Sequence, residues 1–137
     1  MVAGAHVLRA TPEPAVTICV MGALAPEARH AAKRLAEQGL GAELICITSA
    51  DLPFRIRSRS GHDRAENWIL DAIFPDHEAR PMVTVLDGHP QTVAFLAGLH
   101  SVRAAHLGVT DFGQSAHLQK ATPTTTSTRP ASSRDLV

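Results

Sequence analysis

Short apolar runs alternate with amphipathic stretches along the first half of the chain. The run Val16–Met21 (VTICVM) is β-branched and almost wholly apolar, and Ala42–Thr48 (AELICIT) has the same character. Between them, residues 26–38 carry alanine and leucine at helical spacing, with Pro26 at the start and Gly39 after the end. This pattern predicts an amphipathic helix between two buried strands. Such a unit implies a parallel strand pair joined by a right-handed crossover.

The second half of the chain repeats the alternation. A second helix is predicted to carry Trp68 on its buried face and to end at Phe74-Pro75, because proline cannot continue a helix. A third strand is predicted at Met82–Leu86, a third helix from Pro90, and a fourth strand at Val102–Val109. The whole pattern indicates an α/β fold with a mostly parallel sheet.

The pattern predicts one folded domain, at residues 15–115. Residues 1–14 show no periodicity and are expected to form a flexible N-terminal segment. Residues 116–137 are rich in threonine, serine and proline, so a disordered tail is expected there. A chain of 137 residues with 45% hydrophobic residues is long enough to bury one real core.

The charge balance narrows the range of partners. The chain has 13 basic and 13 acidic residues and no net charge, so it lacks the basic footprint of a nucleic-acid or membrane-surface protein. No apolar run approaches the roughly 20 residues of a membrane-spanning helix. The first 14 residues also lack the apolar core of a signal peptide. We therefore expect a cytoplasmic protein whose partners are proteins or small molecules.

Candidate chemistry lies where the predicted strands end. Asp87 and His89 follow the third strand and Asp111 follows the fourth, at the edge where open α/β sheets bind ligands. A carboxylate two residues from an imidazole can orient it as a general base. The alternative is a strand-to-helix turn, in which Asp87 or His89 accepts from helix N-terminal amides and Gly88 takes a positive φ. We favour the turn, and a bend or a close backbone approach is expected at Gly108.

No complete catalytic, cofactor or metal site follows from the residues. The eight histidines form no H-x-x-x-H pair, and the two cysteines form no C-x-x-C motif, so a zinc site is not expected. Phosphate-binding glycine motifs and a G-x-S-x-G elbow are missing as well. Cys19 and Cys46 fall in apolar strands and are expected to be buried, unreactive thiols. Whether the chain is itself an enzyme is left open.

Several of these stretches together resemble the C-terminal domain of the transketolase-type thiamine-dependent enzymes. They cover about residues 16–115 and read VTICVMG, AEQGLGAELICITS, WILDAIFP, RPMVTVLDGHPQTVAFLAGL and HLGVTDFGQS. The succession of VTVLDGHPQT and LGVTDFGQS is most similar to the homodimeric pyruvate dehydrogenase component of bacterial 2-oxo acid dehydrogenase complexes. Beyond residue 115 the chain departs from that family, which continues with an acidic, amphipathic helix that closes the domain.

The resemblance implies a three-layer α/β/α domain that lacks its final helix. Its sheet would have five strands, mostly parallel, with one antiparallel strand. In that family thiamine diphosphate and magnesium are held by other domains, so the resemblance implies no catalytic, cofactor-binding or metal-binding residue in this chain. The implied partners are the thiamine-binding domains of a parent enzyme, itself a homodimer.

Two functions follow as hypotheses. The first is an assembly or dimerisation domain of a pyruvate dehydrogenase-type or transketolase-like enzyme, inactive alone. The alternative is a stand-alone small enzyme, ligand-binding protein or adaptor that uses Asp87, His89 and Asp111. The alternative requires these three side chains to converge on one pocket.

Overall fold

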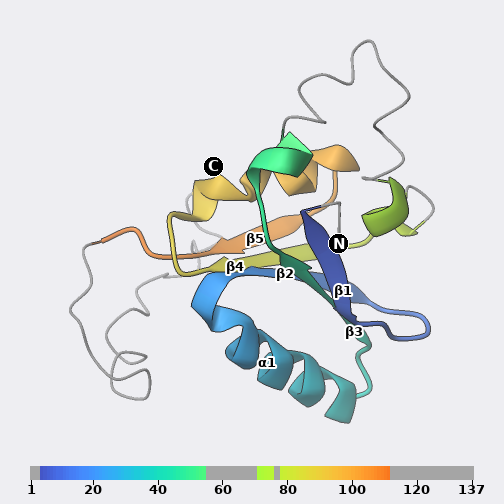
Figure 1. Ribbon diagram of the computed structural model, residues 1–137. Helices are drawn as coiled ribbons and strands as arrows, with labels where there is room; N and C mark the ends of the chain where they lie inside the picture. Colours follow the sequence, from blue (N-terminus) through green and yellow to red (C-terminus); the bar gives the residue numbers. More distant parts are fainter. Residues whose placement is uncertain (1–3, 55–70, 76–77, 112–137) are drawn as a thin grey trace, which may run out of the picture.

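A five-stranded mixed sheet forms the centre of the fold (Figure 1). The structure is a computed structural model that describes residues 4–54, 71–75 and 78–111. The strand order is β1-β3-β2-β4-β5, with β1 antiparallel to β3 and every other neighbouring pair parallel. The predicted fold class, α/β with a mostly parallel mixed sheet, is therefore confirmed. The strands are β1 (Ala5–Arg9), β2 (Val16–Met21), β3 (Ala42–Ile47), β4 (Met82–Leu86) and β5 (Ala104–Leu107).

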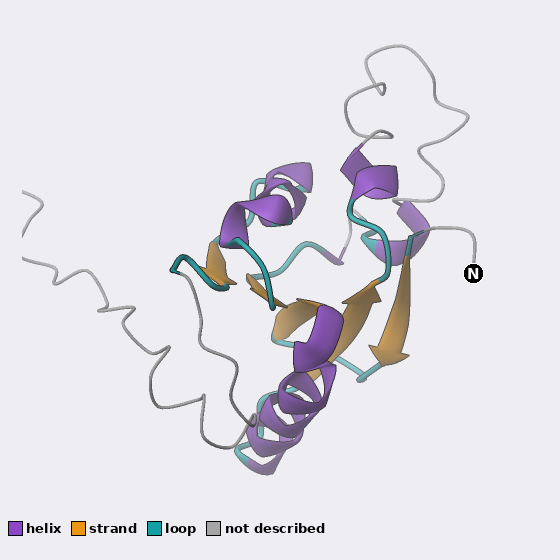
Figure 2. Cartoon of the chain, turned by 60° about the vertical axis from the view of Figure 1, so that its left-hand side comes forward, coloured by secondary structure: helices purple, strands orange, loops and turns teal. Residues whose placement is uncertain are grey.

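Helices lie on both faces of this sheet (Figure 2). The long helix α1 (Ala25–Glu37) covers one face, and short helical turns cover the other. Those turns include the 3₁₀ helices η3 (Pro90–Thr92) and η4 (Ala94–Leu99), while a third, η1 (Gly22–Leu24), links β2 to α1. Among the described residues no helix is long and apolar enough to cross a membrane.

The central strand β2 is buried on both faces. Ile18 and Val20 point toward α1 and pack with Leu44 of β3. Cys19 points the other way and packs in a second cluster with Ile45. Alternate side chains of one strand therefore enter two separate cores. The second cluster also contains Ile73, Phe74, Met82, Leu86, Val93 and Leu96.

The helix α1 lies close to the sheet because its inner face is built from alanine. Ala28 and Ala32 are buried against β2 and β3. Gly39 ends the helix with φ 80°, and Leu40 N donates to Leu35 O at 2.9 Å. The predicted helix over residues 26–38 thus agrees with α1 to within one residue at each end.

The N-terminal segment differs from the prediction. Residues 1–14 were expected to be flexible, but Ala5–Arg9 forms β1 and pairs with β3. The sequence AHVLR alternates only weakly, because an edge strand has one neighbour and one partly exposed face. The register shifts between Val7 and Arg9, which marks a β-bulge.

The region after β4 also differs from the prediction in its helix type. The expected third helix from Pro90 is present as the two 3₁₀ helices η3 and η4, separated at Val93 with φ −119°. Val93, Leu96 and Leu99 recur every third residue, which suits a 3₁₀ helix, and the first two are fully buried. The fourth predicted strand is shortened to β5.

The remaining predictions fall partly outside the described residues. Residues 71–73 are helical and the helix ends before Phe74, as predicted, whereas Trp68 lies outside the described part of the chain. The predicted tail at residues 116–137 lies outside it as well.

Most of β5 is exposed, apart from His106, whose Nδ1 lies 2.8 Å from the buried Thr84 Oγ1.

Candidate functional site

Asp87 connects the carboxyl end of β4 to the turn after β2. Its Oδ2 accepts a hydrogen bond from Ala23 N at 3.0 Å. Gly22 makes this approach possible, because its φ is +79° and a Cβ added there would lie 2.6 Å from Asp87 Cγ. The carboxylate therefore joins two neighbouring strand ends across 64 positions of sequence.

His89 occupies the N-cap position of η3. Its Nδ1 accepts from Gln91 N at 3.3 Å, which agrees with the turn interpretation of Asp-Gly-His-Pro. The predicted positive φ at Gly88 is wrong, since the positive φ near this edge belongs to Gly22. The chain bends at Asp87 and Gly88 without a positive φ and enters η3 through His89, which is extended (φ −64°, ψ 130°).

Gly108 makes the close backbone approach that the sequence predicted. A Cβ added there would lie 2.5 Å from Gly88 O and 2.9 Å from Pro90 N. Next to it, Val109 N donates to Gly88 O at 2.9 Å. The end of β5 is thus held against the turn that follows β4.

The three candidate side chains share one edge of the sheet without a shared contact. Asp111 is exposed and follows β5, the neighbour of β4 in the sheet. Within the described residues no hydrogen bond or ion pair joins Asp111, Asp87 and His89. Asp87 and His89 bond to different backbone amides, so each has a structural role in a turn. A ligand at this edge remains a prediction.

A charged cluster at the opposite, amino edge escaped the sequence analysis. Arg80, just before β4, places its Nη2 3.6 Å from Glu43 Oε2 of β3 and also pairs with the Glu78 carboxylate. The side chains of Arg80 and Glu43 are only 11% and 16% exposed. The sequence signal was a carboxylate inside the apolar run AELICIT.

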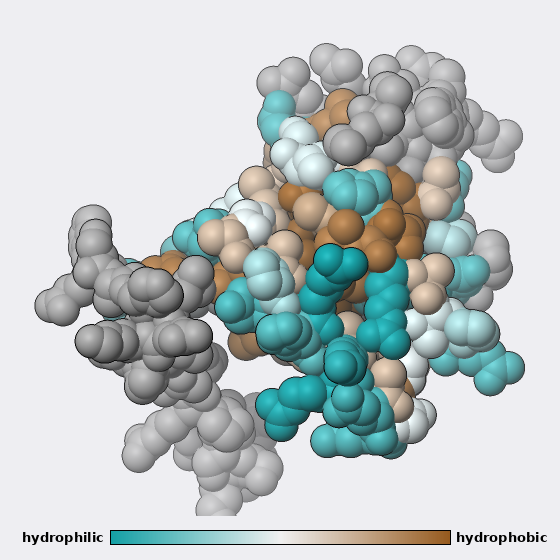
Figure 3. Space-filling model, turned by 60° about the horizontal axis from the view of Figure 1, so that its bottom comes forward, coloured by the Kyte–Doolittle hydropathy of each residue, from teal (hydrophilic) through white to brown (hydrophobic). Residues whose placement is uncertain are grey.

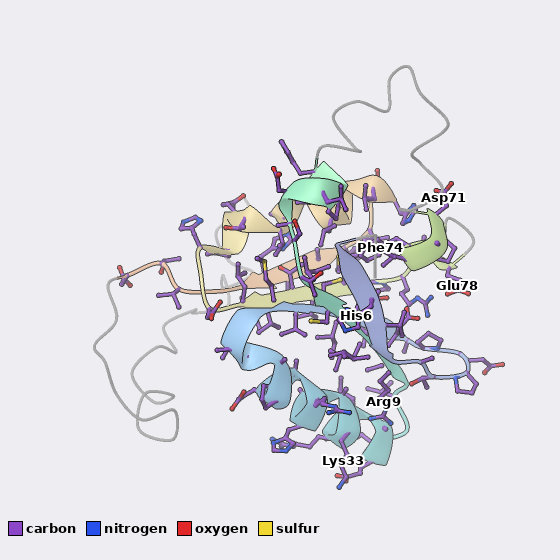
Figure 4. The ribbon with its side chains drawn as sticks, in the orientation of Figure 1. His6, Arg9, Lys33, Asp71, Phe74 and Glu78 are labelled. Atoms are coloured by element: carbon purple, nitrogen blue, oxygen red, sulfur yellow. The ribbon has the colours of Figure 1, made fainter. Side chains whose placement is uncertain are left out.

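A narrow crevice of about 20 Å³ opens beside this cluster. It has room for about one water molecule. Its polar lining includes Glu43, Glu78 and Arg80, together with Thr17 and His100. Glu78 lies near Phe74 at this end of the sheet (Figure 4). The crevice is too small for a substrate or a cofactor, so the cluster is structural.

Among the described residues, burial raises the pKa of two ionisable groups, Cys19 and Glu43. Burial raises the pKa of the Cys19 thiol to about 12, and the nearby charge of Glu43 adds to the effect. Cys19 is therefore the unreactive thiol that the sequence predicted. Burial also raises the pKa of Glu43, the charge of Glu78 raises it further, and Arg80 opposes both. Cys46, by contrast, is only half-buried.

Nowhere in residues 4–54, 71–75 and 78–111 do three or more His, Cys, Asp or Glu side chains gather at metal-binding distance. Magnesium in cofactor sites takes carboxylate and phosphate oxygens. Asp87, the carboxylate best placed at the carboxyl edge, is bonded to Ala23 N instead.

The contact between Gly22 and Asp87 predicts unequal costs for two glycine substitutions. Gly22 and Gly39 both have positive φ, but an added Cβ meets only open space at Gly39. Gly39→Ala should cost about 1–2 kcal/mol for the left-handed backbone. Gly22→Ala should cost a further ~1–3 kcal/mol, because its Cβ displaces the Asp87 carboxylate.

Urea denaturation of the two variants measures this difference. In addition, Asp87→Ala should cost less in the Gly22→Ala background than in the unaltered chain, since the two sites are in contact. Equal costs at Gly22 and Gly39 would show that the Asp87 contact is unimportant.

The raised pKa of Glu43 predicts how stability depends on pH. The folded state holds this proton more tightly than the unfolded state, whose value is near the ordinary 4.5. The stabilisation that protonated Glu43 contributes to the folded state is therefore complete below pH 4.5. It is lost as pH rises through the pKa of Glu43 in the folded state. Glu43→Gln should remove this decline and make the chain more stable at neutral pH.

Unfolding midpoints measured from pH 4 to pH 8 check the Glu43 prediction. Glu37→Gln is the matched control, because Glu37 is exposed at the end of α1. If the control flattens the pH profile as much as Glu43→Gln does, burial of Glu43 is not the cause.

Comparisons with known proteins agree on one kind of domain. Residues 4–126 match a family described as "Transketolase-like TK C-terminal domain". A sequence search of curated proteins finds no match. Three similar solved structures are transketolases, from Campylobacter jejuni (15% identity, TM-score 0.57), from Pichia stipitis as a mutant in complex with xylulose-5-phosphate (18%, 0.61) and from Leishmania mexicana (19%, 0.57).

These structural matches show the fold alone, because the identities are low. Each covers 89% of this chain and only 16% of the transketolase chain. The chain thus spans a small fraction of the proteins that it resembles in fold.

Proposed function

Since the chain belongs to the transketolase-like TK C-terminal domain family, we propose that it acts as the assembly domain of a larger thiamine diphosphate-dependent enzyme. In this role it supports association of the subunits and performs no chemistry alone. Thiamine diphosphate and magnesium are bound by other domains of that enzyme. The observation that carries the proposal is the family match across residues 4–126.

The use of the polar side chains supports a non-catalytic role. Asp87 and His89, the most reactive pair at the carboxyl edge, each accept a hydrogen bond from a backbone amide. A general base must instead reach a substrate proton within hydrogen-bond distance. The Cys19 thiol, with its raised pKa, is not a nucleophile either.

The enzyme class that we propose is the homodimeric pyruvate dehydrogenase type. Its support is the succession of two sequence motifs, VTVLDGHPQT and LGVTDFGQS. The first begins at Val83 in β4, and the second begins at Leu107, the last residue of β5. In the structure these turns contact one another, because Val109 N donates to Gly88 O and Gly108 packs against Pro90. The described parts of the two motifs, residues 83–92 and 107–111, are therefore in contact at the carboxyl edge.

The first test is cofactor binding by the isolated chain. Isothermal titration with thiamine diphosphate and magnesium should give no saturable heat, because the described residues offer no metal-binding group of three or more such side chains. A full-length transketolase under the same conditions is the positive control. Saturable micromolar binding by the chain, or decarboxylation of a 2-oxo acid, would overturn the proposal.

The second test addresses the enzyme class. The chain is mixed with the thiamine-binding part of a homodimeric pyruvate dehydrogenase that lacks its own C-terminal domain. A matched sample contains the equivalent part of a transketolase. We expect co-elution in size-exclusion chromatography with the pyruvate dehydrogenase part only. Co-elution with the transketolase part alone would assign the chain to that branch instead.

A further inference from the structure

An open groove separates α1 from β1 on the face of the sheet that α1 covers. It arises because α1 packs on β2 and β3 and leaves the edge strand β1 uncovered. The groove has a volume of about 770 Å³. The described residues that line it are Leu8, Arg9, Ala25, Pro26, Arg29, His30, Lys33 and Cys46. Hydrophobic surface lies beside hydrophilic side chains on this side of the molecule (Figure 3).

One wall of the groove is basic. Arg29 and Lys33 lie one turn apart on the flank of α1, with His30 beside them. Arg9 reaches the groove from the opposite wall, because the bulge in β1 turns it to the same side as Leu8. Arg9 and Lys33 lie toward the same end of the molecule (Figure 4).

These cations have no anionic partner within the described part of the chain. No aspartate or glutamate is among the described lining residues. The ion pairs formed between described residues involve Arg80 at the other end of the sheet, and none includes Arg9, Arg29 or Lys33. The floor between the walls is formed by Leu8 and Cys46, and Ala25 and Pro26 add apolar surface at the start of the α1 wall. A basic wall over an apolar floor suits an anionic ligand that also carries hydrophobic groups.

The dimensions of the groove favour an extended peptide. From Ala25 to Lys33 the helix rises about 12 Å, which is the length of about four extended residues. Arg29 and Lys33 are offset by about 6 Å along the helix axis, and alternate side chains of an extended chain are offset by about 6.6 Å. Two carboxylates at alternate positions therefore match the two cations.

We propose that this groove binds an extended acidic segment of a partner protein, with carboxylates against Arg29 and Lys33 and apolar side chains on the floor. Arg9 adds a third positive charge from the β1 wall. A small ligand is disfavoured because the groove is open, with α1 and β1 as its described walls and Cys46 of β3 in its floor, whereas small-molecule sites enclose most of their ligand. Nucleic acid is disfavoured by the absence of net charge on the chain.

The test uses a fluorescein-labelled peptide of alternating glutamate and leucine and measures its fluorescence anisotropy with the full chain. Binding should saturate at micromolar to millimolar concentration and weaken as salt increases. Lys33→Glu should weaken binding at least about tenfold, because it replaces an attraction with a repulsion. The matched control is Arg34→Glu, which makes the same charge change on an exposed residue of α1 outside the groove lining.

Other results would overturn the proposal. Equal weakening by Lys33→Glu and Arg34→Glu would show general charge attraction without a groove site. No binding up to millimolar peptide, or equal binding of a peptide of alternating lysine and leucine, would rule out an acidic occupant. Tighter binding of ATP, inorganic phosphate or a single-stranded oligonucleotide, lost in Lys33→Glu, would assign the groove to a phosphate ligand. Circular dichroism establishes that both variants fold.

Discussion

The burial of β2 on both faces is the constraint on which the rest of the domain depends. A strand with apolar side chains on both faces is stable only when both faces of its sheet are covered. Val20 and Cys19 point into different clusters and are each almost fully buried. Parallel pairing with β3 and β4 on its two sides leaves β2 no contact with water along either edge. The layered architecture follows from this one strand.

The polar side chains nearest to β2 hold this arrangement together at its two ends. At the carboxyl end Asp87 bonds to Ala23 N and fixes β4 beside the turn that leads into α1. At the amino end Arg80 links the start of β4 to Glu43 of β3. Both the hydrogen bond and the ion pair join strands that are neighbours in space and distant in sequence. Asp87, a candidate for chemistry in the sequence, therefore joins two strands here, as the Arg80–Glu43 pair does at the other end.

The way α1 covers its face also shapes the surface. Its alanine-lined inner side lets it lie close on β2 and β3, and one helix of this length cannot also cover β1. The groove beside β1 is the consequence, and the bulge in β1 brings Arg9 into it. The proposed binding surface thus arises from the same topology that creates the core. The chain covers only 16% of the transketolase chains that it resembles in fold, and in larger proteins such surfaces are available for contacts between domains or with other chains.

The sequence by itself determined the elements whose signals are local. The boundaries of β2 and β4 agree with the predicted ranges, and α1 differs by one residue at each end, because β-branched runs, Pro26 and Gly39 act through their nearest neighbours. The sequence also located Asp87 and His89 at a strand end, and it indicated correctly that they belong to a turn.

Only the tertiary structure decided the features that depend on distant partners. β1 becomes a strand because Ala5 meets Ile47 and not because AHVLR has a strong pattern. The acceptor role of Asp87 toward Ala23, the pairing of Arg80 with Glu43 and the meeting of Arg9 with Lys33 in one groove each join residues far apart in the chain. Periodicity reports which face of an element is buried, but it carries no information about which element lies across from that face.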